Sequence, residues 1–224
     1  LEWGRQVLGE VPALAFFLLG VFCWFKAIDA RPGRRRFGLV LAAGLFFAMS
    51  VLTKNHFIIL IPTLVLLGFL DRFYYHQDKL VHVVILMVCI LSCVTAWYLG
   101  LNYIGGPEVV QHTVEQWRTA PTRSILLFEP SLVLKNVKFV LGTLVFLSWG
   151  LPGLLYGGFL ASKGDRGGFK AAFLFIFASL WLAWYVTASI GWERNACPGL
   201  AVVAIFVARL FHDLLAGGKT SVRE

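Results

Sequence analysis

The chain has 224 residues, of which 58% are hydrophobic and 14% charged, and its formal net charge at pH 7 is +8. A soluble domain carries roughly a quarter charged residues, so this composition excludes an ordinary soluble fold and predicts a polytopic membrane protein. The positive charge does not indicate a nucleic-acid partner, because the basic residues are not interleaved with aromatic ones as in single-strand binders.

Apolar runs predict membrane-spanning helices, because about 17–25 apolar residues cross the hydrocarbon layer. The expected fold is an all-α transmembrane helix bundle that forms one domain over residues 1–224. The predicted spans are 11–28, 37–53, 57–71, 80–101, 137–161, 169–190 and 196–214. Between the second and third spans, the polar triplet Lys54, Asn55 and His56, with Pro62 after it, favours a tight hairpin over one very long helix.

Lysine and arginine residues are unevenly divided between the two sides of this predicted bundle. The side that contains Arg31, Arg34, Arg35 and Arg36 carries almost twice as many of them as the other. The positive-inside rule places that side in the cytoplasm, which puts the N-terminus outside and the C-terminus inside. The expected location is therefore the plasma (inner) membrane, with the less basic side extracytoplasmic.

The long segment 102–136 is expected to be a loop on the extracytoplasmic side. A Gly-Gly-Pro turn is followed by an amphipathic helix over 109–118, which is expected to lie in the membrane interface. His112, Glu115 and Arg118 share one face of this helix. A solvated face is preferred to a metal site there, because their spacing alone does not supply a metal's ligand geometry.

Single charged residues mark the extracytoplasmic ends of several predicted spans. Such charges cost several kcal/mol to desolvate unless they are paired or in water, so their convergence suggests a site. Glu10, two residues before Pro12, is either a cap at a helix start or an acceptor of hydrogen bonds from substrate hydroxyls. Lys54 either extends its amine to the interface or, with Asn55 and His56 beside it, binds a phosphate.

Glu193 and Arg194 directly precede the last predicted span. They form either a surface ion pair worth about 0–1 kcal/mol or a second phosphate site, since a guanidinium binds two phosphate oxygens. No residue pattern defines a metal site, so no cofactor is assigned, although the pattern leaves room for a divalent cation.

Several segments together resemble a known family. Gly44–Lys54 ends in a Thr-Lys pair before a span with proline, and Leu8–Pro12 places an acidic residue at the opening of an earlier span. Further landmarks are Trp97-Tyr98, Trp149–Gly153, and Arg194 with Pro198. Their order and sidedness resemble the GT-C membrane glycosyltransferases that use polyprenyl-phosphate sugars, in the protein O-mannosyltransferase and lipid A aminoarabinose transferase branch (glycosyltransferase family 39-like). Relatives often have Asp where this chain has Glu10.

The resemblance implies inverting transfer of a sugar from a polyprenyl-phosphate donor to a protein, lipid or glycan acceptor on the extracytoplasmic face. Lys54 and Arg194 would stabilise the departing lipid phosphate, and Glu10 would contact the donor or the acceptor. The family's catalytic carboxylate is expected upstream of Leu1, so the chain is expected to be an N-terminally truncated fragment that is inactive alone. The remaining candidates for substrate binding are Asn55, His56, His112, Glu115, Arg118 and Glu193.

Two other classes of function stay open. A transporter or lipid flippase would require charged residues deep within the spans and broken helices near the membrane midplane, whereas the charges here lie at span ends. A structural membrane subunit without catalytic activity would make the clustering of polar groups on one face accidental.

Overall fold

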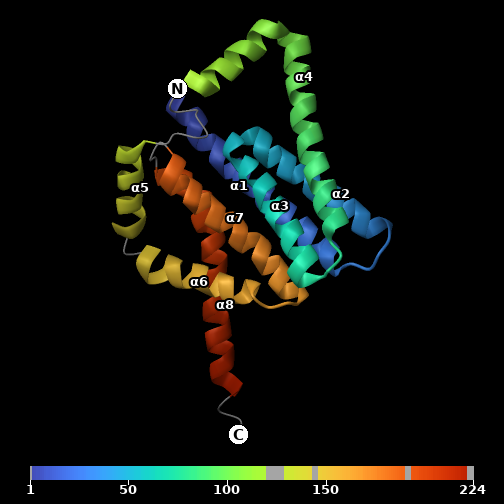
Figure 1. Ribbon diagram of the computed structural model, residues 1–224, viewed down its shortest axis with the longest axis vertical. Coiled ribbons are helices and arrows are strands. Elements are labelled where there is room, and N and C mark those ends of the chain that lie inside the picture. Colours follow the sequence, from blue (N-terminus) through green and yellow to red (C-terminus); the bar gives the residue numbers. More distant parts are fainter. Residues whose placement is uncertain (1, 120–128, 143–145, 190–192, 221–224) are drawn as a thin grey trace. The chain divides into compact units, whose positions relative to one another are not determined.

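Helices make up the part of the chain that the computed structural model describes, residues 2–119, 129–142, 146–189 and 193–220 (Figure 1). These ranges contain no strand, and the predicted all-α fold is confirmed. Side chains are described for all of these ranges except 2–9, 110, 112–114, 116–119, 193 and 217–220. Two compact units divide the chain, unit 1 (Leu1–Ile125) and unit 2 (Leu126–Glu224).

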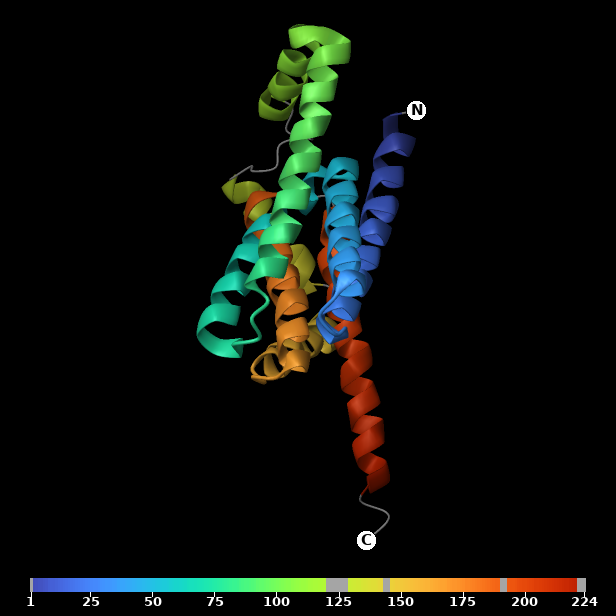
Figure 2. The same ribbon diagram turned by 90° about the vertical axis from the view of Figure 1, so that its right-hand side faces the viewer.

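Unit 1 consists of helices that run back and forth, with α2 packed between α1 and α4 (Figure 2). Its elements are α1 (Glu2–Asp29), α2 (Arg34–Thr53), the 3-10 turn η1 (Asn55–Ile59), α3 (Leu60–Leu70), the π turn η2 (Asp71–Tyr75) and α4 (Leu80–Thr119). The predicted hairpin at Lys54 is therefore confirmed. Because the helices alternate in direction, Glu10 and Lys54 lie at one end of unit 1, and Arg36 and Arg72 at the other.

Close contact between α1, α2 and α4 depends on glycines. A Cβ atom added to Gly20 would lie 2.6 Å from the ring of Phe47, and one added to Gly44 would lie 2.7 Å from Cβ of Cys89. Small residues that let helices approach closely are typical of membrane bundles, where packing rather than the hydrophobic effect drives association. Phe47 and Trp24 are fully buried in this interface, with ring centroids 6.5 Å apart.

At the basic end of unit 1, hydrogen bonds connect the helices. The Nε of Arg36 donates to Nε2 of His82 at 2.9 Å, which joins the start of α2 to the start of α4. The buried carboxylate of Asp71 accepts the backbone N–H groups of Gln77 at 2.8 Å and Lys79 at 2.6 Å. Asp71 thereby holds the turn between η2 and α4, and its burial is compensated by these bonds.

Unit 2 packs α6 against both α7 and α8. Its elements are α5 (Pro130–Gly142), the π turn η3 (Phe146–Gly150), α6 (Leu151–Ala161), α7 (Arg166–Ala188), the 3-10 turn η4 (Glu193–Ala196) and α8 (Cys197–Thr220). Gly153 and Gly157 face Val207 and Phe206 of α8 so closely that a Cβ atom would lie within 2.7 Å of either side chain.

A buried asparagine connects α5 to the end of α7. The Nδ2 of Asn136 donates to the backbone carbonyl oxygens of Tyr185 at 2.8 Å and Ser189 at 3.1 Å. Carbonyl groups in the last turn of a helix have no partner within that helix. Asn136 supplies one, so a polar side chain within an apolar environment has a structural role here.

The predicted spans agree with the structure in part. By length and composition, six described helices can cross a membrane, or seven if one bent pair counts as a single span. That pair, Pro130–Gly142 and Phe146–Ala161, is bent by 70°, so the span expected over 137–161 is either a broken span or a re-entrant segment. The apolar composition of these residues did not reveal the bend.

One of two further expectations is confirmed and the other is wrong. Within the described part of 102–136, the chain breaks at Gly106, where φ is 75° and ψ is 169°, and a second helical stretch runs on to Thr119. The predicted turn and the predicted helix over 109–118 are therefore present. α1 begins at Glu2, so Pro12 lies inside the helix and the interpretation of Glu10 as a cap at a helix start is wrong.

The Gly20–Phe47 contact can be tested by adding one methyl group. We expect Gly20→Ala to lower the free energy of unfolding in detergent by about 1–3 kcal/mol, because the buried ring of Phe47 has to move. Gly38→Ala is the matched control, because no atom lies within 4 Å of a Cβ at that position of α2. Equal unfolding free energies for the two variants would contradict the close packing of α1 against α2.

Candidate functional site

Glu10 and Lys54 form an ion pair at one end of unit 1. The Nζ atom of Lys54 lies 3.2 Å from Oε1 of Glu10, and the two side chains are only 20% and 13% exposed, respectively. Such shielding from solvent strengthens an ion pair relative to one on an open surface. The structure thus brings together two residues that the sequence analysis had assigned separate roles.

Helix α2 ends just before Lys54, so the backbone of Lys54 is not helical. Lys54 has extended backbone angles, φ −144° and ψ 107°, between α2 and η1. Its N–H still donates to the carbonyl of Ser50 at 3.0 Å, and its carbonyl accepts from the N–H of Phe57 at 3.0 Å. Both backbone groups are therefore satisfied, and the ammonium is held at the tip of a short hairpin.

Aromatic packing beneath the pair holds α1 against this hairpin. The ring of Phe17 lies 5.8 Å from that of Phe57 and 6.0 Å from that of Phe47, measured between centroids, and all three side chains are fully buried. The hydroxyl of Ser50 also donates to the carbonyl of Ala13 at 2.8 Å. These contacts lie about one and two helical turns after Glu10 along α1. They fix the position of Glu10 along the helix axis relative to Lys54.

Asn55 and His56 follow Lys54 in η1 and differ in exposure. Asn55 is half-buried, whereas His56 is buried with 9% of its surface exposed. The structure therefore keeps Asn55 within reach of solvent beside the ion pair and places most of His56 inside unit 1. His56 fits a packing role better than contact with a substrate, and its predicted binding role stays a prediction.

The group on α4 is described only in part. His112, Glu115 and Arg118 lie beyond the break at Gly106, and the side chain of Glu115 is exposed. The side chains of His112 and Arg118 lie outside the described residues. The predicted binding roles of all three residues therefore stay predictions.

Glu193 and Arg194 begin η4 in unit 2. Arg194 is half-buried, and the side chain of Glu193 lies outside the described residues. The next residue anchors the turn, because the carbonyl of Asn195 accepts from Nε1 of Trp181 at 2.7 Å and its Nδ2 donates to Oγ of Ser189 at 3.3 Å. These bonds fix the position of η4 on α7. The grouping of Arg194 with Lys54 stays a prediction, because the two lie in different units.

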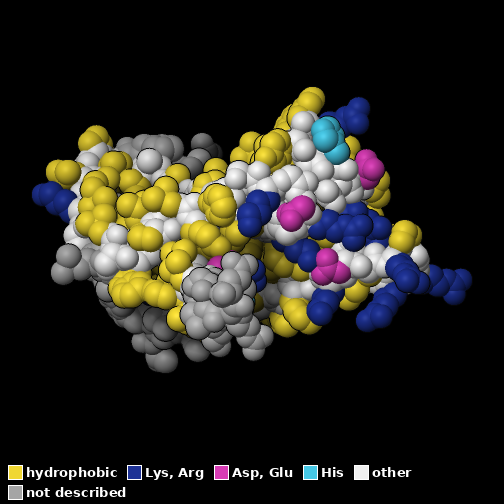
Figure 3. All heavy atoms as spheres, turned by 90° about the horizontal axis from the view of Figure 1, so that it is seen from below, with side chains coloured by type: hydrophobic (Ala, Val, Ile, Leu, Met, Phe, Trp, Pro, Cys, Tyr) yellow, Lys and Arg dark blue, Asp and Glu magenta, His cyan; other side chains and the backbone are white. Residues whose placement is uncertain are grey.

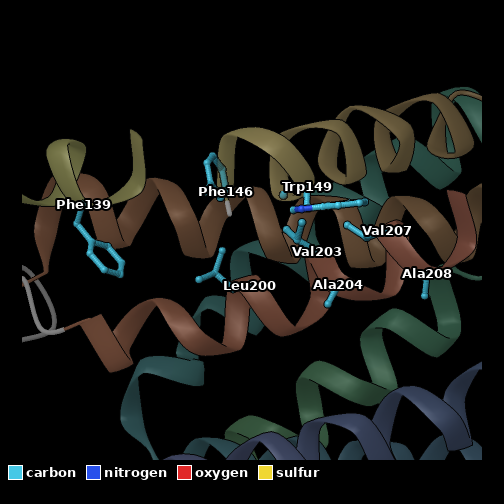
Figure 4. A pocket seen from close by; sticks show the side chains of 9 residues that line it. Phe139, Phe146, Trp149, Leu200, Val203, Ala204, Val207 and Ala208 are labelled. Carbon is cyan, nitrogen blue, oxygen red and sulfur yellow. The ribbon is translucent and has the colours of Figure 1, made fainter. Parts of the chain in front are cut away.

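Unit 2 contains an apolar pocket of about 420 Å³ (Figure 4). Phe139 from α5, Phe146 and Trp149 from η3, and Leu200 and Val203 from α8 are among its lining side chains. The lining offers hydrocarbon contacts and scarcely any hydrogen-bonding groups. Such a pocket suits an apolar chain rather than a sugar or a metal ion. The composition of its separate segments did not predict this pocket, because its lining comes from α5 and η3 together with α8, which is distant from them in the sequence.

The described residues contain no cluster of three or more His, Cys, Asp or Glu side chains arranged to hold a metal ion. The predicted option of a divalent cation therefore gains no candidate ligand set within those ranges. The four cysteines, Cys23, Cys89, Cys93 and Cys197, are free thiols.

The Glu10–Lys54 pairing was missed by the sequence analysis, although a signal for it was present. Glu10 lies 19 residues before the end of α1, and Lys54 lies 20 residues after the start of α2. Helices that are joined by a short turn and rise equally per residue bring such positions to the same height. Opposite charges at equal distances from one turn thus predict an ion pair.

Comparison with protein-family models, curated proteins and solved structures found no match to this chain. The resemblance to GT-C glycosyltransferases accordingly stays a prediction, and a function has to be argued from the residues themselves.

The ion pair predicts an energetic coupling between its two partners. In a double-mutant cycle with Glu10→Gln and Lys54→Met, we expect a coupling free energy of about 1 kcal/mol or more, measured by unfolding in detergent. The control cycle uses Arg209 and Asp213, a pair four residues apart on α8 at 2.9 Å whose arginine is 58% exposed. That pair should couple more weakly, because water and salt screen exposed charges. If the Glu10–Lys54 coupling free energy were no larger than that of Arg209–Asp213, the Glu10–Lys54 pair would not be shielded from solvent.

Proposed function

We propose that the chain is part of a membrane glycosyltransferase that transfers a sugar from a polyprenyl phosphate to an acceptor hydroxyl or phosphate. The observation that carries the proposal is the shielded Glu10–Lys54 ion pair at the end of unit 1 opposite the arginine cluster. The uneven distribution of basic residues favours an extracytoplasmic position for this end. A lipid phosphate lies at this depth of a membrane, where it can reach the ammonium.

The pair suits a reaction in which negative charge grows on a phosphate. When the bond between the sugar's anomeric carbon and the phosphate oxygen breaks, the electron pair stays on that oxygen, and the lipid phosphate gains one negative charge. An ammonium has three N–H donors, and the carboxylate of Glu10 occupies one of them at 3.2 Å. Lys54 can therefore donate to the leaving phosphate as well, which stabilises the transition state more than the ground state.

Glu10 orients the ammonium of Lys54 before the donor binds. A lone ammonium at the edge of an apolar bundle would be costly, and a neighbouring carboxylate removes much of that cost. Asn55 is the neighbouring group in unit 1 best placed to contact the sugar. The predicted phosphate role of Arg194, in unit 2, stays a separate prediction. The acceptor's proton requires a general base, and none of the described residues is assigned that role.

Unit 2 contains its own candidate for hydrocarbon binding. The pocket's volume of about 420 Å³ and its lining of aromatic and aliphatic side chains suit several isoprene units. Within unit 2 alone, it is a candidate site for the apolar part of a lipid.

One observation favours the second candidate, a lipid or small-molecule transporter. The 70° bend between α5 and the helix that follows it is the kind of broken helix found in transporters. The ionisable groups of unit 1 lie at span ends rather than near the midplane, which favours the transferase.

The proposal predicts a loss of transfer when Lys54 is replaced. With the full-length polypeptide in proteoliposomes and a series of polyprenyl-phosphate sugars, Lys54→Ala should lower the rate of sugar transfer about 100-fold, as expected when one charge-stabilising donor is lost. Lys54→Arg should retain part of the rate because the charge remains. Lys26→Ala is the matched control, because this exposed lysine lies at the opposite end of α1, above the ring of Phe22.

Melting temperatures of the three variants separate a loss of catalysis from a loss of folding. Full activity in a folded Lys54→Ala variant would remove Lys54 from the phosphate site. Movement of a lipid substrate across the bilayer, without transfer from any donor in the series, would favour the transporter.

A further inference from the structure

A groove between α3 and α4 opens on the side of unit 1, near its basic end. It has a volume of about 310 Å³ and is lined by apolar side chains except at one position, Arg72. Its floor consists of Leu64 and Val83, which are buried, and its walls include Phe69 and Leu80, which are exposed. The groove is therefore about one side chain deep and accessible from the surrounding medium.

The space over the floor exists because residue 68 is a glycine. A Cβ atom at Gly68 would lie 3.5 Å from Cδ1 of Leu80 and 3.6 Å from Cγ1 of Val83, which are ordinary contact distances. A side chain at this position would therefore fit and fill the groove. An apolar groove on a membrane-facing surface is occupied by hydrocarbon, because water there would find almost no hydrogen-bonding partner.

Arg72 gives the groove a charged end. Its side chain is exposed in η2, at the end of the third span, and it makes no ion pair with a carboxylate of the described chain. The nearby Asp71 is buried and engaged with two backbone N–H groups. The guanidinium of Arg72 therefore remains available to an anion from outside the chain.

Further positive charge surrounds this end of unit 1. The start of α2 joins the start of α4 through the bond from Arg36 to His82, which places the arginines at the start of α2 on the same end as Arg72. Figure 3 shows Lys and Arg side chains gathered there. The exposed arginines of this end are Arg31, Arg34, Arg35 and Arg72. Such clusters attract anionic lipid headgroups and repel a basic protein partner.

We propose that the groove between α3 and α4 binds one anionic glycerophospholipid, with an acyl chain along the groove and the headgroup phosphate on Arg72. From Leu64 to Arg72 the groove extends about 12 Å along the helix, which matches part of an acyl chain. A guanidinium can donate two parallel hydrogen bonds to phosphate oxygens. The site differs from the proposed donor site, because it lies at the opposite end of unit 1 from Lys54.

The test uses the full-length protein in detergent, with phosphatidylglycerol or phosphatidylcholine added and bound lipid counted by native mass spectrometry. The wild-type protein should retain one phosphatidylglycerol in preference to phosphatidylcholine. Arg72→Ala should weaken phosphatidylglycerol binding about tenfold, because a hydrogen-bonded charge pair is lost. It should weaken phosphatidylcholine binding less, because the choline group offsets the negative charge of that phosphate. Arg166→Ala, which removes an exposed arginine of unit 2, is the matched control and should bind as the wild type does.

Gly68→Leu tests the groove itself, because it fills the space without changing charge. It should abolish the preference for phosphatidylglycerol while the melting temperature in lipid-free detergent stays close to that of the wild type. If this variant does not fold, Val65→Phe, at a partly exposed lining position, replaces it. The proposal would be overturned if the wild type bound the two lipids equally, or if Arg72→Ala bound phosphatidylglycerol as the wild type does. It would also be overturned if the protein formed a dimer that Gly68→Leu disrupts and that lipid does not affect.

Discussion

Close packing of α1 against α2 is the constraint on which the candidate site depends. Gly20 lets the buried ring of Phe47 approach α1, and Phe17 packs against both Phe47 and Phe57. This packing sets the height of Glu10 on α1 relative to Lys54 at the tip of the hairpin. An ion pair at 3.2 Å follows from the register of two helices rather than from a flexible loop. A phosphate that approaches Lys54 would thus meet an ammonium already held in place by Glu10.

Three polar side chains within the apolar units bond to backbone or side-chain groups at the ends of elements. Asp71 accepts the N–H groups of a turn, Asn136 donates to the last carbonyls of α7, and Asn195 connects η4 to Trp181. At these three places, side chains form hydrogen bonds with backbone groups at or near the ends of helices. Such bonds are needed in a membrane, where no water is present to replace them. Lys54 and Arg72 place positive charge at opposite ends of unit 1, and each is proposed above to bind a phosphate. The two proposed sites therefore rest on the same physical principle.

Much of the fold could be predicted from the sequence, because apolar runs of sufficient length have one stable form in lipid. The hairpin at Lys54 and the break at Gly106 also followed from local chemistry. The bend before α6 did not, because hydropathy measures composition and not helix direction. The start of α1 was misjudged because Pro12 is usually read as a helix opening. Of the candidate site, Lys54 and Glu10 were identified singly, and their pairing needed the register of α1 and α2. The roles of His112, Arg118 and Glu193 stay predictions.

If Lys54 binds the phosphate of a lipid-linked sugar, the Glu10–Lys54 end of unit 1 has to face the extracytoplasmic side, where the sugar donor and its acceptor would meet. The most direct measurement is labelling of single cysteines in intact cells with a thiol reagent that does not cross membranes, after replacement of the four native cysteines. Asn55→Cys, beside the ion pair, should be labelled in intact cells, and Ala30→Cys, at the basic end, only after the cells are permeabilised. Both positions are half-buried, which makes them comparable. Labelling of Ala30→Cys but not of Asn55→Cys in intact cells would contradict the account.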